Sequence, residues 1–274
     1  MQDRDALTTL AWLVEAGADE AVADAPVNRL VVKPPAPAAP VPVVPRAPAP
    51  RTAPVPSPLA SSGNDAIGDA MRAAATARSL EELKAAMEAF EGSALKRAAT
   101  NTVFADGTPG GRVMFIGEAP GRDEDRIGKP FVGRAGQLLD KMLASIDLDR
   151  SRNCYITNVI NWRPPDNRDP SPEEAAICLP FLRRHIELAN PGIIVLLGAV
   201  AARHVMGITE GIMRTRGRWM EYRVGDAMVP VMPTLHPAYL LRQPAHKKLA
   251  WRDLQAVASR MEALGLPEPA MRVS

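Results

Sequence analysis

The chain has 274 residues, a formal net charge of +2 and 46% hydrophobic residues, so it is long enough to bury a sizeable core. The nearly balanced charge excludes a protein that works through a global cationic field, and two cysteines are too few for a disulfide framework. No apolar run approaches the ~20 residues that a membrane-spanning helix needs, and the acidic start lacks the pattern of a signal peptide. We expect a soluble protein of the cytoplasm.

The first 64 residues divide into two segments. Residues 1–25 carry apolar side chains at helical spacing, which predicts one amphipathic helix. Residues 26–64 are rich in proline and alanine, and proline lacks an N–H group and fixes φ, so we expect an extended, flexible linker without a core. A specific proline-rich docking motif is the alternative for this segment. The remaining residues, 65–274, form the predicted globular domain.

From residue 65 onward, helical and strand patterns alternate. Ser79 is suited to cap a helix that reaches Phe90, and Pro172 follows the capping residue Ser171 at the start of a helix that reaches Ala189. Further helices are predicted over 137–146, 199–206 and 247–264, and strands over 113–116, 155–160, 193–198, 218–224 and 228–232. This alternation predicts an α/β fold, a three-layer α/β/α sandwich with a central, mostly parallel sheet.

Three polar segments follow predicted strands, at 117–131, 158–165 and 234–239. Ligands of parallel α/β sheets bind at the carboxyl ends of the strands, so we expect these segments to meet in one site. In the first, glycine at 117 allows close approach of a ligand to the backbone, and Glu118 is placed to orient water or to stabilise a cation. Phe131 offers an aromatic face for a planar ligand, although a place in the core is the alternative.

The other two segments each contribute one notable polar residue. Asn158 ends a β-branched run, and its amide can both donate to and accept from the edge of a base, or else satisfy local backbone. His236 lies in a proline-bounded turn, where an imidazole can stabilise developing negative charge, although a structural role is the alternative. Residues 203–252 carry nine Lys or Arg against three Asp or Glu, which favours either phosphate contacts or a solvated charged face.

In order and spacing, five motifs resemble the uracil-DNA glycosylases of family 4 over about residues 95–264: GEAPGRDED, GKPFVGRAG, YITNVINWRPPDNRDPSPEE, IIVLLGAVA and LHPAYLLR. The resemblance implies an enzyme of base excision repair that hydrolyses the N-glycosidic bond of uracil flipped out of DNA, on the fold of that family. It implies catalytic roles for Glu118 and His236, and a uracil pocket formed by Gly117, Ala119, Phe131 and Asn158.

The resemblance further implies a loop that enters the DNA helix and other DNA contacts at Arg163, Tyr239, Leu240, Leu241, Arg242 and Lys247. The family usually holds a four-iron, four-sulfur cluster on four cysteines, and this chain departs from it at three of them. The equivalent positions are Phe90, Ser93, Trp162 and Cys178, so only the last is a cysteine. Cluster ligation needs thiolates, so we expect no iron–sulfur cluster, no other cofactor and no metal ion.

Two other functions remain open. A non-catalytic sensor of uracil or abasic lesions would use the same fold and site. A nucleotide-binding enzyme would use the glycine-rich loop for phosphates, but both the Walker A and the dinucleotide-binding spacings are missing. For the enzyme we expect a monomer, located near the nucleoid, that acts on single- and double-stranded DNA containing uracil. Its N-terminal helix and proline tether would contact a repair or replication protein.

Overall fold

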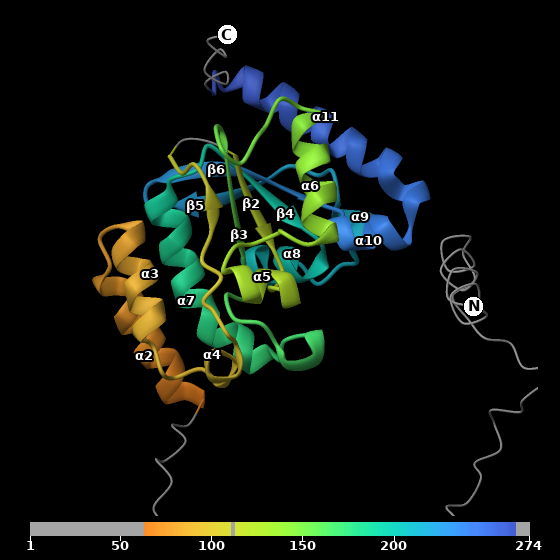
Figure 1. Cartoon of the computed structure of the whole chain (residues 1–274). Helices are drawn as coiled ribbons and strands as arrows, with labels where there is room; N and C mark the ends of the chain where they lie inside the picture. Colours follow the sequence, from red (N-terminus) through yellow and green to blue (C-terminus); the bar gives the residue numbers. More distant parts are fainter. Residues whose placement is uncertain (1–62, 111–112, 267–274) are drawn as a thin grey trace, which may run out of the picture. The chain divides into compact units, whose positions relative to one another are not determined.

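The computed structural model describes residues 63–110 and 113–266. These residues form one six-stranded sheet, with the strand order β1-β3-β2-β4-β6-β5, and the helices around it (Figure 1). The four central strands run parallel, and the two edge strands are antiparallel to their neighbours. The predicted mostly parallel sheet is therefore confirmed. The strands are β1 (Asp106–Gly107), β2 (Val113–Gly117), β3 (Cys154–Asn158), β4 (Ile193–Leu197), β5 (Met220–Val224) and β6 (Ala227–Thr234).

Strands β2, β3 and β4 are buried at every residue, because helices cover both faces of the sheet. Successive side chains of a strand point to opposite faces, and β2 shows this directly. Met114 and Ile116 pack into one apolar cluster, whereas Val113 and Phe115 pack into the other. The sheet therefore separates two cores, one on each face.

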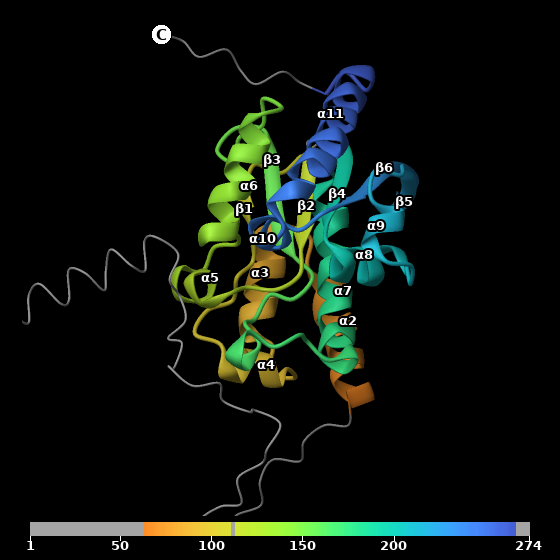
Figure 2. The same ribbon diagram turned by 90° about the vertical axis from the view of Figure 1, so that its right-hand side faces the viewer.

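Helices form the two outer layers (Figures 1 and 2). The first core is closed by α2 (Gly63–Thr76), α3 (Leu80–Ala89), α7 (Pro172–Ala189) and α8 (Ala199–Met206). The second is closed by α6 (Arg134–Ala144), α10 (Pro237–Arg242) and α11 (Lys247–Ala263). The connections contain the short helices α4 (Ala94–Ala98), α5 (Arg122–Ile127) and α9 (Ile212–Thr215), and the 3-10 turns η1 (Pro165–Asn167) and η2 (Pro244–His246). The predicted three-layer α/β/α sandwich is confirmed.

Local capping explains where the predicted helices begin. The Ser79 hydroxyl accepts a hydrogen bond from the Glu82 N–H at 3.2 Å, so α3 starts one residue after Ser79. At the start of α7, the Ser171 hydroxyl accepts from the Glu174 N–H at 3.2 Å, and the Glu174 carboxylate accepts from the Ser171 N–H at 2.8 Å. This reciprocal pair is a capping box, and it confirms the predicted start at Pro172.

Most element predictions are confirmed with small shifts at the ends, and several elements were not predicted at all. Helix α6 begins at Arg134 instead of 137, and β6 runs from Ala227 to Thr234, longer than the predicted 228–232. The unpredicted elements are either alanine-rich, as α2 is, or too short to show a periodic pattern: α2, α4, α5, α9, α10 and β1.

The predicted N-terminal helix (1–25) and nearly all of the predicted linker (26–64) lie outside the described residues. The first described helix, α2, begins at Gly63, close to the predicted start of the globular domain. Among the described helices, none combines the length and the apolar character that crossing a membrane requires.

Candidate active site

The predicted site segments meet along the edge of the sheet that is formed by the carboxyl ends of the parallel strands, not by an outer strand (Figure 1). Gly117 at the end of β2 pairs in register with Asn158 at the end of β3. On the far side of β2, Leu197 at the end of β4 pairs with Thr234 of β6, two residues before His236. The parallel register therefore brings the ends of β2, β3 and β6 to the same edge, as expected from their order in the sheet.

Gly117 lies at the centre of this edge because two side chains pack directly over its Cα. A Cβ atom at residue 117 would lie 2.4 Å from Oδ1 of Asn158 and 2.5 Å from Cζ of Phe131. Real Cβ atoms do not approach other atoms so closely, so only glycine fits here. The amide and the ring therefore share one narrow space above Gly117.

Phe131 provides the aromatic face of this space. Its side chain is 6% exposed, and its ring centroid lies 5.5 Å from that of His236 with the planes tilted by 33°. The backbone of Phe131 is in the left-handed region, with φ of 53°, which costs a non-glycine residue roughly 1–2 kcal/mol. The surrounding structure must offset this cost to hold the ring where it is.

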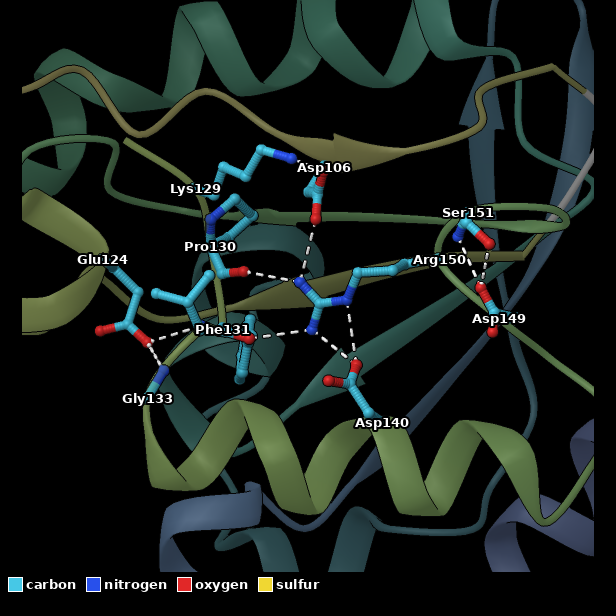
Figure 3. Close-up of polar contacts among 11 residues, drawn as sticks. Asp106, Glu124, Lys129, Pro130, Phe131, Gly133, Asp140, Asp149, Arg150 and Ser151 are labelled. Carbon is cyan, nitrogen blue, oxygen red and sulfur yellow. Dashed lines mark hydrogen bonds and ion pairs between the residues drawn. The ribbon is translucent and has the colours of Figure 1, made fainter. Parts of the chain in front are cut away.

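Two charged side chains hold the backbone around Phe131 (Figure 3). The Glu124 carboxylate accepts hydrogen bonds from the N–H groups of Val132 and Gly133, both at 2.9 Å. The Arg150 guanidinium donates to the carbonyl oxygen of Phe131 at 2.8 Å and to that of Pro130 at 3.1 Å. The backbone on both sides of the aromatic ring is thus fixed by ionic partners.

Asn158 is 2% exposed, and its Oδ1 atom has no hydrogen-bond partner in the described part of the chain. A buried acceptor without a partner costs about 1–3 kcal/mol, so natural proteins rarely keep one without a reason. A ligand with an N–H group beside Asn158 would satisfy it. The open acceptor is therefore a candidate contact for a polar, planar group.

His236 is the N-cap residue of α10, and its Nδ1 accepts a hydrogen bond from the Ala238 N–H at 3.1 Å. Burial, with a smaller effect from the Arg242 cation, lowers the pKa of His236 to about 4, so the ring is neutral at pH 7. Because Nδ1 accepts, the neutral ring carries its proton on Nε2. His236 therefore presents one fixed N–H donor, of the kind that stabilises developing negative charge without being a cation.

Glu118 follows Gly117 and is half-buried. Burial raises the pKa of its carboxyl group above the usual range, and the carboxylate of Asp169 raises it further, whereas Arg203 of α8 has a smaller opposing effect. Its backbone carbonyl accepts a hydrogen bond from the Ile160 N–H at 2.9 Å, which extends the pairing beyond β3. Ala119, the next residue, is half-buried against the first core.

The segment predicted to enter DNA is the helix α10. The Leu240 side chain is 1% exposed and packs in the second core, so it does not lie on the surface where a DNA contact is expected. Leu241 is the apolar side chain of this helix that faces outward, at 37% exposed. The Tyr239 hydroxyl is hydrogen-bonded to Nδ1 of His246 at 2.7 Å.

Two of the three basic residues predicted to contact DNA are exposed, and the third is half-buried. Arg242 and Lys247 are exposed, and Arg163 is half-buried and donates to Oδ1 of Asn167 at 2.7 Å. Arg216, counted above in the basic surplus of residues 203–252, is instead paired with the buried carboxylate of Asp253. This arginine is therefore used within the fold.

The residues at the cluster-ligand positions do not fit an iron–sulfur cluster. The Phe90 and Trp162 rings are stacked with centroids 6.3 Å apart, and Phe181 meets Phe90 edge-on at 5.2 Å. Cys178 is buried and is the one thiol among the four positions, whereas cluster ligation needs a set of thiolates. One thiol, a serine (Ser93) and a packed aromatic cluster supply no set of four ligands.

Two surface hollows lie away from this edge of the sheet. One of about 340 Å³ lies between α2 and α7, and one of about 910 Å³ lies between the end of α6 and α11. Neither is lined by a predicted site residue. The candidate active site therefore rests on the convergence of side chains at the strand ends rather than on the size of a hollow.

Four further residues shape the site, and none of them was among the predicted site residues. Arg150 shows no local pattern, because the carbonyl groups that it binds are 19 and 20 residues earlier in the chain. Asp169 and Arg203 act on Glu118 from distant loops and helices. Only Glu124 has a local indication, since it is the third residue of α5 and accepts from the Gly121 N–H at the N-cap position.

The sheet carries three groups near its strand ends: an aromatic ring, a buried amide and a neutral histidine. Together they suit an enzyme that binds a planar ring and stabilises negative charge on it. Residues 104–255 match the Uracil DNA glycosylase superfamily, and the chain belongs to that superfamily.

Individual relatives agree with this assignment. The chain is 41% identical to a type-4 uracil-DNA glycosylase of Thermotoga maritima over 61% of this chain and 86% of the relative. It is 40% identical to a protein of the same name from Archaeoglobus fulgidus, over 65% of this chain and 89% of the relative. A third, from Sulfurisphaera tokodaii, is 38% identical over 65% of this chain and 83% of the relative.

Proposed function

We propose that this chain hydrolyses the N-glycosidic bond of uracil in DNA and that the base is received against the ring of Phe131 and the amide of Asn158. The chain is a uracil-DNA glycosylase: its superfamily match is accompanied by type-4 relatives aligned over more than four fifths of their own length. A base inside a duplex cannot be reached, so uracil must first swing out of the helix at a cost of a few kcal/mol. The products are free uracil and an abasic site.

The residues above Gly117 suit the recognition of uracil. The unpaired Oδ1 of Asn158 can accept the N3–H of uracil, and the amide N–H₂ of the same side chain can donate to O4. The ring of Phe131 offers a face on which the flat base stacks. Of these two groups, Oδ1 of Asn158 is the one without a partner in the described structure.

His236 and Glu118 suit the bond cleavage. As the bond between N1 and C1′ breaks, its electron pair moves to uracil, and the Nε2–H of His236 donates to O2 of the resulting anion. The sugar becomes oxocarbenium-like, and the Glu118 carboxylate stabilises it and orients the incoming water. The water oxygen bonds to C1′, and the proton that it loses ends on the uracil anion.

The observation that carries this proposal is that Asn158 and His236 both lie close to the ring of Phe131. Within the described residues, Asn158 is a buried acceptor without a partner, and His236 is a neutral donor whose tautomer is set by the Ala238 N–H. Uracil leaving as an anion needs an acceptor for N3–H and a donor for O2 at the same time. Asn158 supplies the acceptor and His236 supplies the donor.

Single-turnover excision on a uracil-containing oligonucleotide, read by alkaline cleavage at abasic sites, tests these roles. Loss of one donor of this type costs about 10²–10³ in rate, so we expect that reduction in His236→Ala and in Asn158→Ala. Circular dichroism should show an unchanged fold. Wild-type rates in both variants would remove the roles given to these residues.

A non-catalytic lesion sensor is the second candidate, and the same assay separates it from an enzyme. A sensor would bind uracil-containing or abasic DNA without producing alkali-sensitive sites. The neutral, oriented His236 favours the enzyme, because binding alone does not require a donor at O2.

A phosphate-binding role for the glycine-rich loop is disfavoured by Glu124. Its carboxylate accepts from the N–H groups of Gly121, Val132 and Gly133, so these amides are not free to bind phosphate. A phosphate placed there would also meet the negative charge of Glu124. Thermal shift with free nucleotides should show no stabilisation.

We further propose that the enzyme acts without an iron–sulfur cluster. The stacked Phe90 and Trp162 and the buried thiol of Cys178 support this, because they form an apolar core at the ligand positions. The purified protein should be colourless, and iron analysis should find no stoichiometric iron. A brown protein with visible iron–sulfur absorption would overturn the proposal.

The surface around α10 is proposed to hold DNA. Leu241 is placed to fill the gap left by the flipped base, and Arg163, Tyr239, Arg242 and Lys247 are placed to contact the neighbouring strand. Such contacts make binding dependent on salt. We propose that the enzyme acts as a monomer, on DNA of the nucleoid.

Residues 1–25 and 26–64 are proposed to be a partner-binding helix and its tether, outside the catalytic domain of 65–274. A chain that lacks residues 1–60 should therefore excise uracil at a normal rate. A large loss of excision would place part of the catalytic function in this segment.

A further inference from the structure

Arg150 uses all of its hydrogen-bond donors on one cluster of acceptors (Figure 3). Its Nε–H donates to Oδ1 of Asp140 at 3.0 Å, and one terminal nitrogen donates to the same oxygen at 2.7 Å and to the Phe131 carbonyl. The other terminal nitrogen donates to Oδ2 of Asp106 at 3.1 Å and to the Pro130 carbonyl. These are five bonds for five N–H groups, so the guanidinium has one orientation in which every donor is satisfied.

The two aspartates fix that orientation from opposite sides. Asp140 lies on α6 and Asp106 lies on β1, so Arg150 links a helix and an edge strand to the loop that carries Phe131. The Arg150 side chain is 19% exposed, and its neighbours are carboxylates and carbonyl groups. The charge is therefore paired, and the two carbonyl bonds are the part of this network that reaches the site.

Glu124 holds the next two amides of the same loop. One carboxylate oxygen accepts from the Val132 and Gly133 N–H groups, and the other accepts from Gly121 at 3.1 Å. Glutamine at 124 would place an amide N–H₂ against an N–H group on one side or the other. The bonds thus require a carboxylate, as the bonds of Arg150 require a guanidinium.

We propose that Arg150 and Glu124 form a clasp that keeps Phe131 in its left-handed conformation and so sets the position of the ring on which the flipped base stacks. We name this pair the Phe131 clasp. Both are positioning residues, since they contact the backbone of residues 130–133 and reach the base only through the ring. The inference rests on the proposed function and adds residues to which that function assigns no role.

The geometry explains why the ring needs such a clasp. Phe131 has a φ of 53° where glycine would be the easier residue, and Gly136 closes the other side, since a Cβ there would lie 1.8 Å from the Phe131 carbonyl oxygen. Without Arg150 and Glu124, the backbone of Phe131 is free to return to the common right-handed or extended regions. The ring would then leave its place above Gly117.

The test uses Arg150→Lys and Glu124→Gln in the full-length chain. Lysine keeps the charge but cannot form the forked bonds to two carbonyl groups. A misplacement of about 1 Å can cost 10²-fold, so we expect single-turnover uracil excision to fall by about 10- to 100-fold in each variant. The affinity for a duplex that contains a tetrahydrofuran abasic analogue should not change, because that duplex has no base to stack.

A double-mutant comparison separates positioning from a general loss of structure. In a Phe131→Ala background there is no ring to place, so adding Arg150→Lys should lower the rate no further. The matched control is Arg126→Lys, an exposed residue of the adjoining helix α5 whose side chain pairs with Asp123. This control should excise uracil at the wild-type rate.

The outcomes are distinct. A wild-type chain that excises no uracil refutes the proposed function itself. Excision by the wild type, with Arg150→Lys and Glu124→Gln equally fast, refutes the clasp and leaves the function intact. The clasp is also refuted if Phe131→Ala is as fast as the wild type, or if Arg150→Lys slows the Phe131→Ala chain as much as it slows the wild type.

Discussion

Replacing Gly117 by alanine is the most direct test of the site geometry, because a single methyl group would enter the space shared by Phe131 and Asn158. The new Cβ would lie 2.4 Å from Oδ1 of Asn158 and 2.5 and 2.6 Å from two ring carbons of Phe131. Ordinary contact begins near 3.4 Å. The amide and the ring must therefore each retreat by about 1 Å if the backbone does not move.

Two magnitudes follow from this displacement. Forcing an extra methyl group into a packed interior typically costs about 1–3 kcal/mol of unfolding free energy. A shift of about 1 Å at the reacting groups can cost 10²-fold in rate, so we expect Gly117→Ala to excise uracil about 100 times more slowly. Urea unfolding measures the first effect, and single-turnover alkaline cleavage of a uracil oligonucleotide measures the second.

Gly211→Ala is the matched control, because no heavy atom would lie within 4 Å of the added Cβ and its φ is −62°. We expect nearly normal stability and excision for that variant. If Gly117→Ala excises uracil at the wild-type rate, then Phe131 and Asn158 do not form the pocket in which the base is held, and the reasoning about this edge of the sheet is wrong.

Three further predictions follow from charge and backbone. Burial raises the pKa of the Glu118 carboxyl group, and the proposed mechanism requires its ionised form. Excision should therefore decline on acidification, at a pH above the usual glutamate range. Glu118→Gln should excise uracil more slowly and should not show this decline. Burial lowers the pKa of His185 to about 3, against about 6.5 in the unfolded chain. Between these two pH values the unfolded state binds more protons than the folded state. The free energy of unfolding therefore falls by up to about 1.4 kcal/mol per pH unit on acidification through that range. Urea unfolding from pH 7 to 4 should therefore give a shallower slope for His185→Phe. Gly68→Ala in the interior of α2 should stabilise the protein by up to about 1 kcal/mol in the same assay, because the new Cβ meets only the flexible end of Arg72.

Features encoded over a few neighbouring residues could be predicted from the sequence. The strand over 193–198 follows from an unbroken apolar run, and the start of α7 follows from Ser171, Pro172 and Glu174. The residue types at the strand ends also predicted a site there. The strand and helix predictions hold because capping bonds and continuous burial act within a few residues of the chain.

Features that depend on distant partners could not be predicted in this way. The contact of Asn158 with Gly117 follows from the register of β2 and β3, which lie about 40 residues apart in the chain. Arg216 appeared to be a surface cation, but its partner Asp253 is 37 residues away. The family resemblance placed Leu240 in a DNA-contacting loop, but it does not show which side chains of a short helix face the core. In α10, Leu240 points inward and Leu241 outward.

The position of His236 at the first turn of α10 has a mechanical consequence. The histidine caps this six-residue helix, and Leu241 lies near its other end, so one rigid rod joins the two side chains. A helix rises about 1.5 Å per residue, so the length of α10 sets how far the outward leucine lies from the imidazole.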